Sequence, residues 1–268
     1  MNRIDSTFRT LRRQGRCALI PFLTAGDPDM DTTRRLMRAA VECGADLLEL
    51  GVPFSDPIAD GPALQKSIEY ALTAGSSLPR VLEVIADFRK QSEVPIILYG
   101  YYNPIFRYGV DRFAQDAARA GVDAVLIVDL PPEEVDELYP QVRAAGVHFI
   151  FLLTPTSGPD RVAKVLKKAS GFVYYVSLTG VTGSSAISID GVQEAVDKIR
   201  LRTKLPIGVG FGISTPDQAA AVSRFADAAV VGTALMRVVD AARGTDHVVE
   251  DAAAFIRGIK GGMRDGKG

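Results

Sequence analysis

Short apolar runs alternate with amphipathic segments along the whole chain. The runs are rich in β-branched residues, and the segments between them repeat apolar positions at helical spacing. This alternation is typical of βαβ units that build a parallel sheet. Most runs are apolar throughout, as expected for strands buried on both faces. Eight strands are predicted, at residues 18–23, 46–50, 95–100, 124–128, 149–153, 173–177, 206–210 and 228–232.

The segments between the strands predict helices. A glycine follows several of them, at Gly44, Gly121 and Gly146, where a left-handed backbone commonly ends a helix. Two helices fit between the second and third strands, and two more after the eighth, divided at Gly244. The Gly- and Lys-rich tail from Gly258 onward is expected to fray. The clearest amphipathic segments are residues 32–43, 78–91, 111–120, 132–145 and 190–200.

Eight strands separated by helices predict an α/β fold, a single (β/α)8 TIM barrel, with one domain over residues 1–268. Ile4, Phe8 and Leu11 repeat at helical spacing before the first strand, so an extra N-terminal helix should cover the N-terminal mouth of the barrel. A doubly wound open sheet is the alternative fold. The absence of an obvious edge strand favours closure into a barrel.

The composition excludes several classes of partner. The 268 residues include 31 Lys+Arg and 32 Asp+Glu, a net charge of −1, so no general basic field attracts nucleic acid or an acidic membrane. No stretch approaches about 18 consecutive apolar residues, and the charged N-terminus lacks the apolar core of a signal peptide. We therefore expect a cytoplasmic protein, in which Cys17 and Cys43 are buried and reduced.

A carboxylate stands inside the second predicted strand. Active sites of (β/α)8 barrels lie at the carboxyl ends of the strands. Glu49 lies there among Leu47, Leu48 and Leu50, which leave no polar face. A solvated strand end or a structural hydrogen bond is the alternative, but a carboxyl group buried in an apolar run favours an acid/base catalyst. Asp60 follows on a loop rich in Pro and Gly, where Asp commonly makes turns, so its spacing alone is weak support for catalysis.

Glycine-rich loops follow the last three predicted strands. The seventh strand runs into Gly210 and Gly212, and the eighth runs through Gly232 into Thr233 at the start of a helix. Backbone N–H groups at such a helix N-terminus bind phosphate, and loops after strands 7 and 8 carry this site in many barrels. The loop at residues 177–185 is either a flexible connection or a lid over the ligand.

The positions of Lys and His narrow the range of reaction mechanisms that the chain could use. A Schiff-base mechanism needs a Lys at the carboxyl end of a strand, and no predicted strand ends in one. His148 opens the fifth strand at the opposite mouth and His247 lies in the C-terminal helices, so neither favours a metal site. Carboxylate acid/base chemistry on a phosphorylated substrate, with no metal, remains.

Six strings in order along nearly the whole chain resemble the family of tryptophan synthase α subunits. They are PFLTAGDP at 21–28, LELGVPFSDPIADGP at 48–62, GYYNP at 100–104, DLPPEE at 129–134, GVTG at 180–183 and GFGIS at 210–214. The second string is highly specific. The resemblance implies a carbon–carbon lyase of tryptophan biosynthesis, which cleaves indole-3-glycerol phosphate to indole and glyceraldehyde 3-phosphate by a retro-aldol reaction.

The resemblance also implies the roles of individual residues. Glu49 would protonate indole C3 and help move the glycerol hydroxyl proton. Asp60 would stabilise positive charge at the indole nitrogen, Tyr174 would support the site, and Thr182 would act in the lid. Relatives often have Ser where Thr233 stands, and a basic or bulkier residue where this chain has Ser184 and Ser185. The implied indole pocket comprises Phe22, Tyr101, Leu126, Leu152 and Phe211, and the implied phosphate site comprises Gly183, Gly212, Gly232 and Thr233.

A protein partner is implied as well. Members of the family work as α2β2 heterotetramers, in which indole passes to a β subunit that carries pyridoxal phosphate. The α chain itself would need no cofactor. The residues that match the partner-facing region are Asp56, Pro57, Asn103, Pro104 and Pro131.

Two other functions stay open at this point. A sugar-phosphate isomerase built on the same barrel would share the glycine loops but not the string at 48–62. A non-catalytic activating subunit would share the partner-facing surface but release no indole. Activity of the chain alone, and with a β partner, separates these alternatives.

Overall fold

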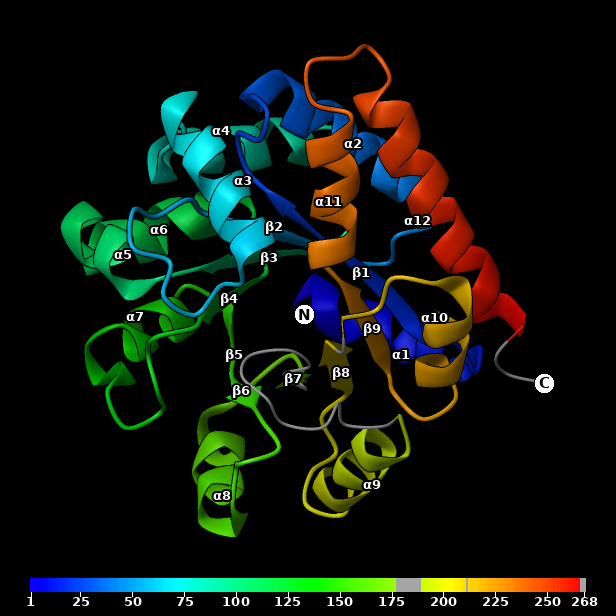
Figure 1. Cartoon of the computed structure of the whole chain (residues 1–268). Helices are drawn as coiled ribbons and strands as arrows, with labels where there is room; N and C mark the ends of the chain where they lie inside the picture. Colours follow the sequence, from blue (N-terminus) through cyan, green and yellow to red (C-terminus); the bar gives the residue numbers. More distant parts are fainter. Residues whose placement is uncertain (177–188, 211, 266–268) are drawn as a thin grey trace.

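The computed structural model describes residues 1–176, 189–210 and 212–265 (Figure 1). Within them, nine strands form one sheet, and neighbouring strands pair in parallel. The strands are β1 (Ala18–Thr24), β2 (Leu48–Gly51), β3 (Ile96–Gly100), β4 (Ala124–Ile127), β5 (His148–Ile150), β6 (Leu152–Leu153), β7 (Val173–Val176), β8 (Ile207–Gly210) and β9 (Ala228–Val231).

The strand order closes the sheet into a barrel. β1 pairs with both β2 and β9, and the sheet extends to β5 on one side and to β6 on the other. A single residue, Phe151, joins β5 to β6, so the sheet returns on itself and the predicted (β/α)8 barrel is confirmed. The prediction of one continuous strand over 149–153 is wrong. It is divided because β5 pairs with β4 whereas β6 pairs with β7.

Helices surround the barrel (Figure 1). As predicted, two lie between β2 and β3 and two follow β9. Among the described residues, no helix is both long enough and apolar enough to span a membrane. The helices are α1 (Arg3–Arg13), α2 (Met30–Glu42), α3 (Pro62–Thr73), α4 (Leu78–Arg89), α5 (Tyr102–Tyr108), α6 (Val110–Ala120), the 3-10 helix η1 (Val135–Glu137), α7 (Tyr139–Ala144), α8 (Pro159–Lys168), α9 (Ile189–Arg200), α10 (Pro216–Ser223), α11 (Thr233–Ala241) and α12 (Val248–Asp265).

Local sequence signals explain where several helices begin or end. The Asp29 side chain accepts a hydrogen bond from the Thr32 N–H and begins α2. Gly44, Gly121 and Gly146 have φ angles of 97°, 90° and 79°, which confirms them as helix-ending glycines. The predicted helix over 132–145 is wrong in its first part. Pro140 lacks an N–H and is tolerated only in the first turn of a helix, so η1 precedes a short α7.

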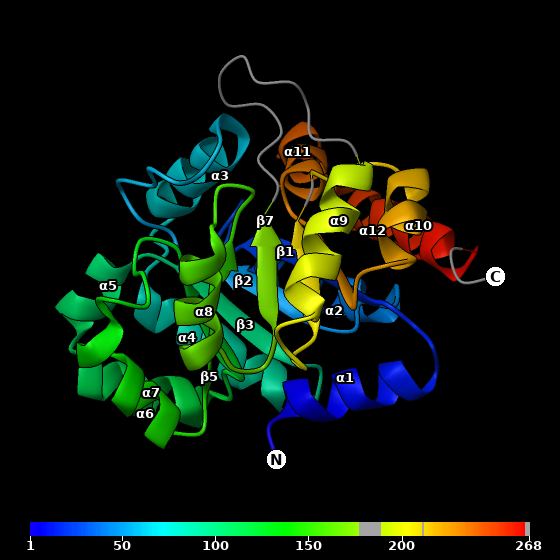
Figure 2. The same ribbon diagram turned by 90° about the horizontal axis from the view of Figure 1, so that it is seen from below.

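The extra N-terminal helix closes one mouth of the barrel, as predicted. Figure 2 shows α1 lying across the end from which β7 begins. Ile4, Phe8 and Leu11 are buried on one face of α1 and pack against the inward side chains of the strands. The Phe8 and Phe172 rings lie 5.5 Å apart. Chemistry is therefore confined to the opposite mouth.

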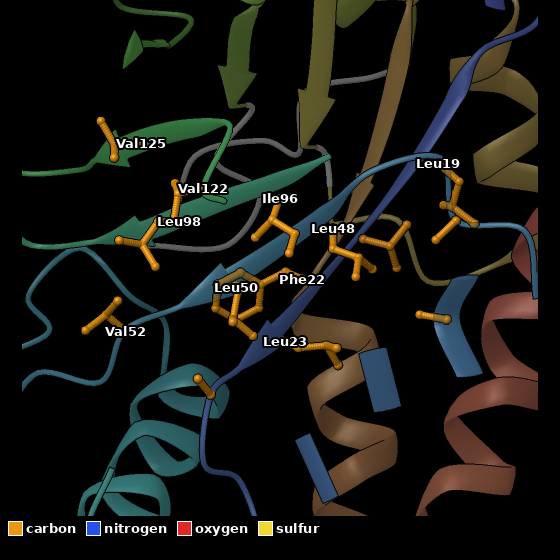
Figure 3. Close-up of a cluster of buried hydrophobic side chains, with 14 of the residues drawn as sticks. Leu19, Phe22, Leu23, Leu48, Leu50, Val52, Ile96, Leu98, Val122 and Val125 are labelled. Carbon is orange, nitrogen blue, oxygen red and sulfur yellow. The ribbon is translucent and has the colours of Figure 1, made fainter. Parts of the chain in front are cut away.

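Alternation along each strand divides the core into two layers. Leu47 belongs to the cluster inside the barrel, while Leu48 and Leu50 belong to the cluster between the barrel and its helices. Figure 3 shows part of this outer layer, with Leu19, Leu23, Leu48 and Leu50 of β1 and β2 beside the helices. Phe22, which is drawn with them, lies opposite Glu49 in the register and so points to the inner side. Glu49 lies between Leu48 and Leu50 in the sequence and so points inward, to the same side as Leu47.

The expectation that the tail frays from Gly258 is wrong for residues 258–265, and residues 266–268 lie outside the described part of the chain. α12 continues through these glycines to Asp265, because the helix packs on α10, α2 and α11. Lys260 is 4% exposed and its ammonium donates to the carboxylate of Asp46. Gly262 lies so close to α10 that an added Cβ would be 2.4 Å from the Pro216 carbonyl oxygen. Glycine here permits close helix packing rather than loosening the chain.

Candidate active site

Glu49 is a buried carboxyl group inside the barrel. It lies in β2, opposite Phe22 of β1 and Ile97 of β3 in the register. Its side chain is 2% exposed, and its Oε1 atom has no hydrogen-bond partner among the described residues. Burial, with a further contribution from the charge of Asp60, raises the pKa of Glu49 from 4.5 to about 8. The group therefore holds a proton near neutral pH and can release it.

Asp60 lies beside the same space but in a different environment. It is 7% exposed and accepts hydrogen bonds from the Tyr99 hydroxyl at 2.8 Å and the Tyr101 hydroxyl at 2.6 Å. Burial raises the pKa of Asp60, and the two hydroxyl donors oppose that rise. Asp60, for which the spacing gave only weak support as a catalytic residue, is thus a buried, hydrogen-bonded carboxyl group near Glu49.

Tyr174 completes this group from the other side of the barrel. It lies in β7, beside Leu152 of β6 and Gly208 of β8 in the register. Burial, and then the charge of Glu49, raise the pKa of its hydroxyl well above the ordinary value, so the phenol is neutral. A Cβ added at Gly210 would lie 2.7 Å from the Tyr174 hydroxyl, so this glycine makes room for the ring.

The described members of the predicted indole pocket line the inside of the barrel near Glu49. Leu126 of β4 lies in the inner cluster, and Leu152 packs against it. The Phe22 ring lies 5.2 Å from the Tyr99 ring, edge to face. A Cβ at Gly51 would meet the Phe22 ring at 2.7 Å, so glycine is required beside it. Tyr101 is also at this mouth, although it contacts Asp60 through its hydroxyl. Phe211 lies outside the described residues.

The start of α11 offers an anion site at the same mouth. Its N-cap residue is Gly232, no side chain caps the first turn, and no acidic residue lies there. The N–H groups of a first turn have no partner within the helix, so they are donors for an anion. Gly232 also adjoins Phe22, whose Cβ would lie 3.3 Å from an added Cβ. Thr233 is half-buried at the first helical position.

Gly212 is the other described member of the predicted phosphate site. It is exposed after β8, with a φ of 68°, a conformation that favours glycine. It precedes α10, whose own first turn is closed by a capping box between Thr215 and Gln218. Of the two helices that follow these strands, α11 is therefore the one whose first-turn N–H groups have no side-chain acceptor. Gly183 and the predicted lid residue Thr182 lie outside the described residues.

The predicted partner-facing residues lie on the loops after β2, β3 and β4. Asp56 and Asn103 are exposed, while Pro57, Pro104 and Pro131 are partly buried. The Tyr101 hydroxyl accepts from the Ala59 N–H at 3.1 Å, which fixes the loop after β2 against the start of α5. Large apolar side chains accompany this surface: Ile58 is 84% exposed and Phe106 is 58% exposed.

The described residues contain no group of three His, Cys, Asp or Glu side chains placed to hold a metal ion. His148 opens β5 at the closed mouth, where its Nε2 lies 3.0 Å from Asp5 of α1. His247 is exposed just before α12. Cys17 and Cys43 are buried, as predicted. The titratable groups found beside Glu49 are thus a carboxyl group, Asp60, and the phenols Tyr99 and Tyr174.

Sequence reasoning missed Tyr99. Its hydroxyl donates to Asp60, and burial raises its pKa well above the ordinary value. The signal was present in the alternation of β3, because Tyr99 falls on the same side as Ile97 at the carboxyl end of the strand. Tyr101 was assigned only to an apolar pocket, yet it too positions Asp60.

Comparisons with known proteins agree with this geometry. Residues 8–264 match the family model for the tryptophan synthase alpha chain. The chain is 51% identical over 264 residues to the tryptophan synthase alpha chain of Geotalea uraniireducens, covering 98% of each protein. It is 49% identical over 266 residues to that of Citrifermentans bemidjiense, covering 99% of each.

Solved structures show the same likeness in three dimensions. The crystal structure of tryptophan synthase subunit alpha from Legionella pneumophila matches with a TM-score of 0.93 and 40% identity over 99% of both chains. A chain of Mycobacterium tuberculosis tryptophan synthase matches with a TM-score of 0.89 and 33% identity over 98% of both. With nearly its whole length matched in sequence and in fold, this chain belongs to the tryptophan synthase alpha chain family.

Proposed function

We propose that Glu49 moves the protons in the reaction of this family. Alpha chains of tryptophan synthase cleave indole-3-glycerol phosphate to indole and glyceraldehyde 3-phosphate, and this chain is such a lyase. The observation that carries the proposal is a carboxyl group 2% exposed inside the barrel, with one oxygen unpartnered among the described residues and a pKa of about 8. A catalytic acid that must also act as a base needs a pKa near the working pH.

The steps of a retro-aldol cleavage fit one such group. Protonated Glu49 gives its proton to indole C3, and the ring becomes an iminium ion with positive charge at its nitrogen. The bond from C3 to the glycerol carbon then breaks, and its electron pair returns to the ring. The hydroxyl on that carbon becomes the aldehyde as its proton passes to the Glu49 carboxylate, which restores the starting acid. No metal or cofactor takes part in these transfers.

Asp60 is proposed to stabilise the charge at the indole nitrogen. A carboxylate accepting bonds from Tyr99 and Tyr101 is held in one orientation, so it needs no rearrangement as positive charge develops. Tyr174, a half-buried neutral phenol facing Glu49, is proposed to shape the other side of the site.

The rest of the substrate is proposed to extend from these carboxyl groups to α11. Phe22, Leu126 and Leu152 offer an apolar surface to indole, and Gly232 beside Phe22 leads to the uncapped first turn of α11. The phosphate would accept from N–H groups there and near Gly212. The proposed contacts of the same substrate also include Tyr101, Thr233, Phe211 and Gly183.

Alpha chains of this family form a complex with a β subunit, and pyridoxal phosphate belongs to that partner. We place the contact surface on the loop after β2 and on α5, where exposed Ile58 and Phe106 accompany Asp56, Pro57, Asn103, Pro104 and Pro131. Indole leaves the same mouth of the barrel. We also propose a cytoplasmic location, since a charged phosphate ester does not cross a membrane unaided.

Glu49→Gln tests the catalytic role. The amide keeps the shape of the side chain but cannot give and take a proton, so indole release should fall at least about 100-fold while substrate binding persists. Glu83→Gln, at an exposed position of α4, is the matched control and should keep full activity. Both are assayed alone and with a β subunit. Retention of more than a tenth of the rate by Glu49→Gln would overturn the assignment.

A further inference from the structure

A second cavity lies outside the barrel, between α8 and α9. It has a volume of about 370 Å³, within the size range of small-molecule sites. In the view of Figure 2, α8 and α9 lie on either side of β7. Apolar side chains from the sheet and from both helices line the cavity. They include Leu153 of β6, Val162 of α8, and Ala195 and Ile199 of α9. It is separate from the catalytic space, which lies on the other face of β7.

Tyr175 brings a buried polar group into this cavity. It follows Tyr174 in β7, so the two rings point to opposite faces: Tyr174 toward Glu49, and Tyr175 toward the outer cavity that it lines. Tyr175 is 2% exposed, and its hydroxyl has no hydrogen-bond partner among the described residues. Burial raises the pKa of this phenol, so it is a neutral donor. The hydroxyl is not one of the fully enclosed polar atoms, so it is open to the cavity and can donate to a ligand there.

The cavity also has cationic groups. Lys198 and Arg202 line it together with one acidic residue, Glu194. The Lys198 ammonium lies 3.7 Å from the Glu194 carboxylate, with both side chains about three-quarters exposed, so this pair is weak. One guanidinium nitrogen of Arg202 donates to the Pro159 carbonyl at 2.9 Å, which leaves its other donors available.

We propose that this cavity binds a small amphipathic carboxylate. Its apolar body would lie against Leu153, Val162 and Ile199. Its carboxylate would accept from the Tyr175 hydroxyl and face Lys198 and Arg202. The combination of an apolar lining, a hydroxyl donor without a protein partner and an excess of positive charge selects an anion with an apolar body over a neutral hydrocarbon or a bare inorganic ion. The site does not depend on the assignment of Glu49.

The test titrates the full-length chain with 4-phenylbutyrate by calorimetry, and in parallel with 4-phenylbutanol, which has the same body without the charge. We expect one carboxylate per chain, binding at about 1 mM or tighter, and at least tenfold weaker binding of the alcohol. Tyr175→Phe should weaken binding about fivefold, the effect of one lost hydrogen bond. Lys198→Gln should also weaken it, whereas Lys167→Gln, on the exposed face of α8, should not.

A pair of variants on α9 locates the site. Ala195→Phe fills the cavity and should abolish binding, whereas Gln193→Phe, exposed on the same helix and outside the lining, should leave it unchanged. Both variants should still release indole at the wild-type rate, which separates this site from the catalytic one. No binding up to 20-fold above about 1 mM, equal binding of acid and alcohol, or undiminished binding to Ala195→Phe would each overturn the proposal.

Discussion

The buried acid at Glu49 makes the folded state sensitive to pH, and Glu49→Gln should remove that sensitivity. The pKa of Glu49 is raised from 4.5 to about 8 in the folded chain. As pH rises, the unfolded chain loses this proton first. The stability contributed by the protonated group is thus fully present below pH 4.5 and is lost as pH approaches 8. At about 1.4 kcal/mol per pH unit, the loss amounts to about 5 kcal/mol.

The assay is urea unfolding, followed by circular dichroism from pH 4.5 to 8.5. The difference in unfolding free energy between Glu49→Gln and the wild type should rise in favour of Gln over this range and level off above pH 8. Glu83→Gln serves as control and should give a flat difference, because its side chain is exposed. A flat difference for Glu49→Gln as well would refute the reasoning, since it would mean that Glu49 ionises at its ordinary pH despite its burial.

Three further predictions follow from the same structure. Tyr101→Phe removes one donor to Asp60, so the pKa of Asp60 should rise further. The kcat for indole release should then fall about tenfold near pH 7. An unchanged pH profile of kcat would count against this positioning role. Phe106→Asp should weaken binding of the β subunit at least about tenfold, measured by light scattering, while the isolated chain releases indole at its usual rate. In α12, Gly262→Ala should destabilise the fold by about 1–3 kcal/mol through contact with Pro216, whereas Gly258→Ala, facing open space, should stabilise it by up to about 1 kcal/mol in urea unfolding.

The strands and their order were accessible from the sequence because a strand buried on both faces is apolar at every position. β1, β4 and β9 appear within a residue or two of their predicted ends. The break at Phe151 was not accessible. Whether one run forms one strand or two depends on which neighbours it pairs with, and pairing joins residues far apart in the chain. Periodicity carries no such information.

The glycines of α12 show a similar limit. Helix propensity disfavours Gly258, Gly261 and Gly262 in a helix, and local reasoning therefore predicts fraying. The contact of Gly262 with α10 and the buried pair of Lys260 with Asp46 outweigh that preference. Both involve partners more than 40 residues away in the chain. A local scale cannot register them.

For the site, the sequence indicated Glu49 but left Asp60 undecided, and the structure supplies the reason for their difference. Both carboxyl groups are buried, and burial alone would raise both pKa values. Asp60 receives two hydroxyl donors, from Tyr99 and Tyr101, which favour its charged form. Glu49 has an oxygen without any donor among the described residues. A single proton shared between the two groups therefore resides on Glu49. The donors that keep Asp60 charged also allow its charge to raise the pKa of Glu49, so Tyr99 and Tyr101 act on both carboxyl groups while touching only one.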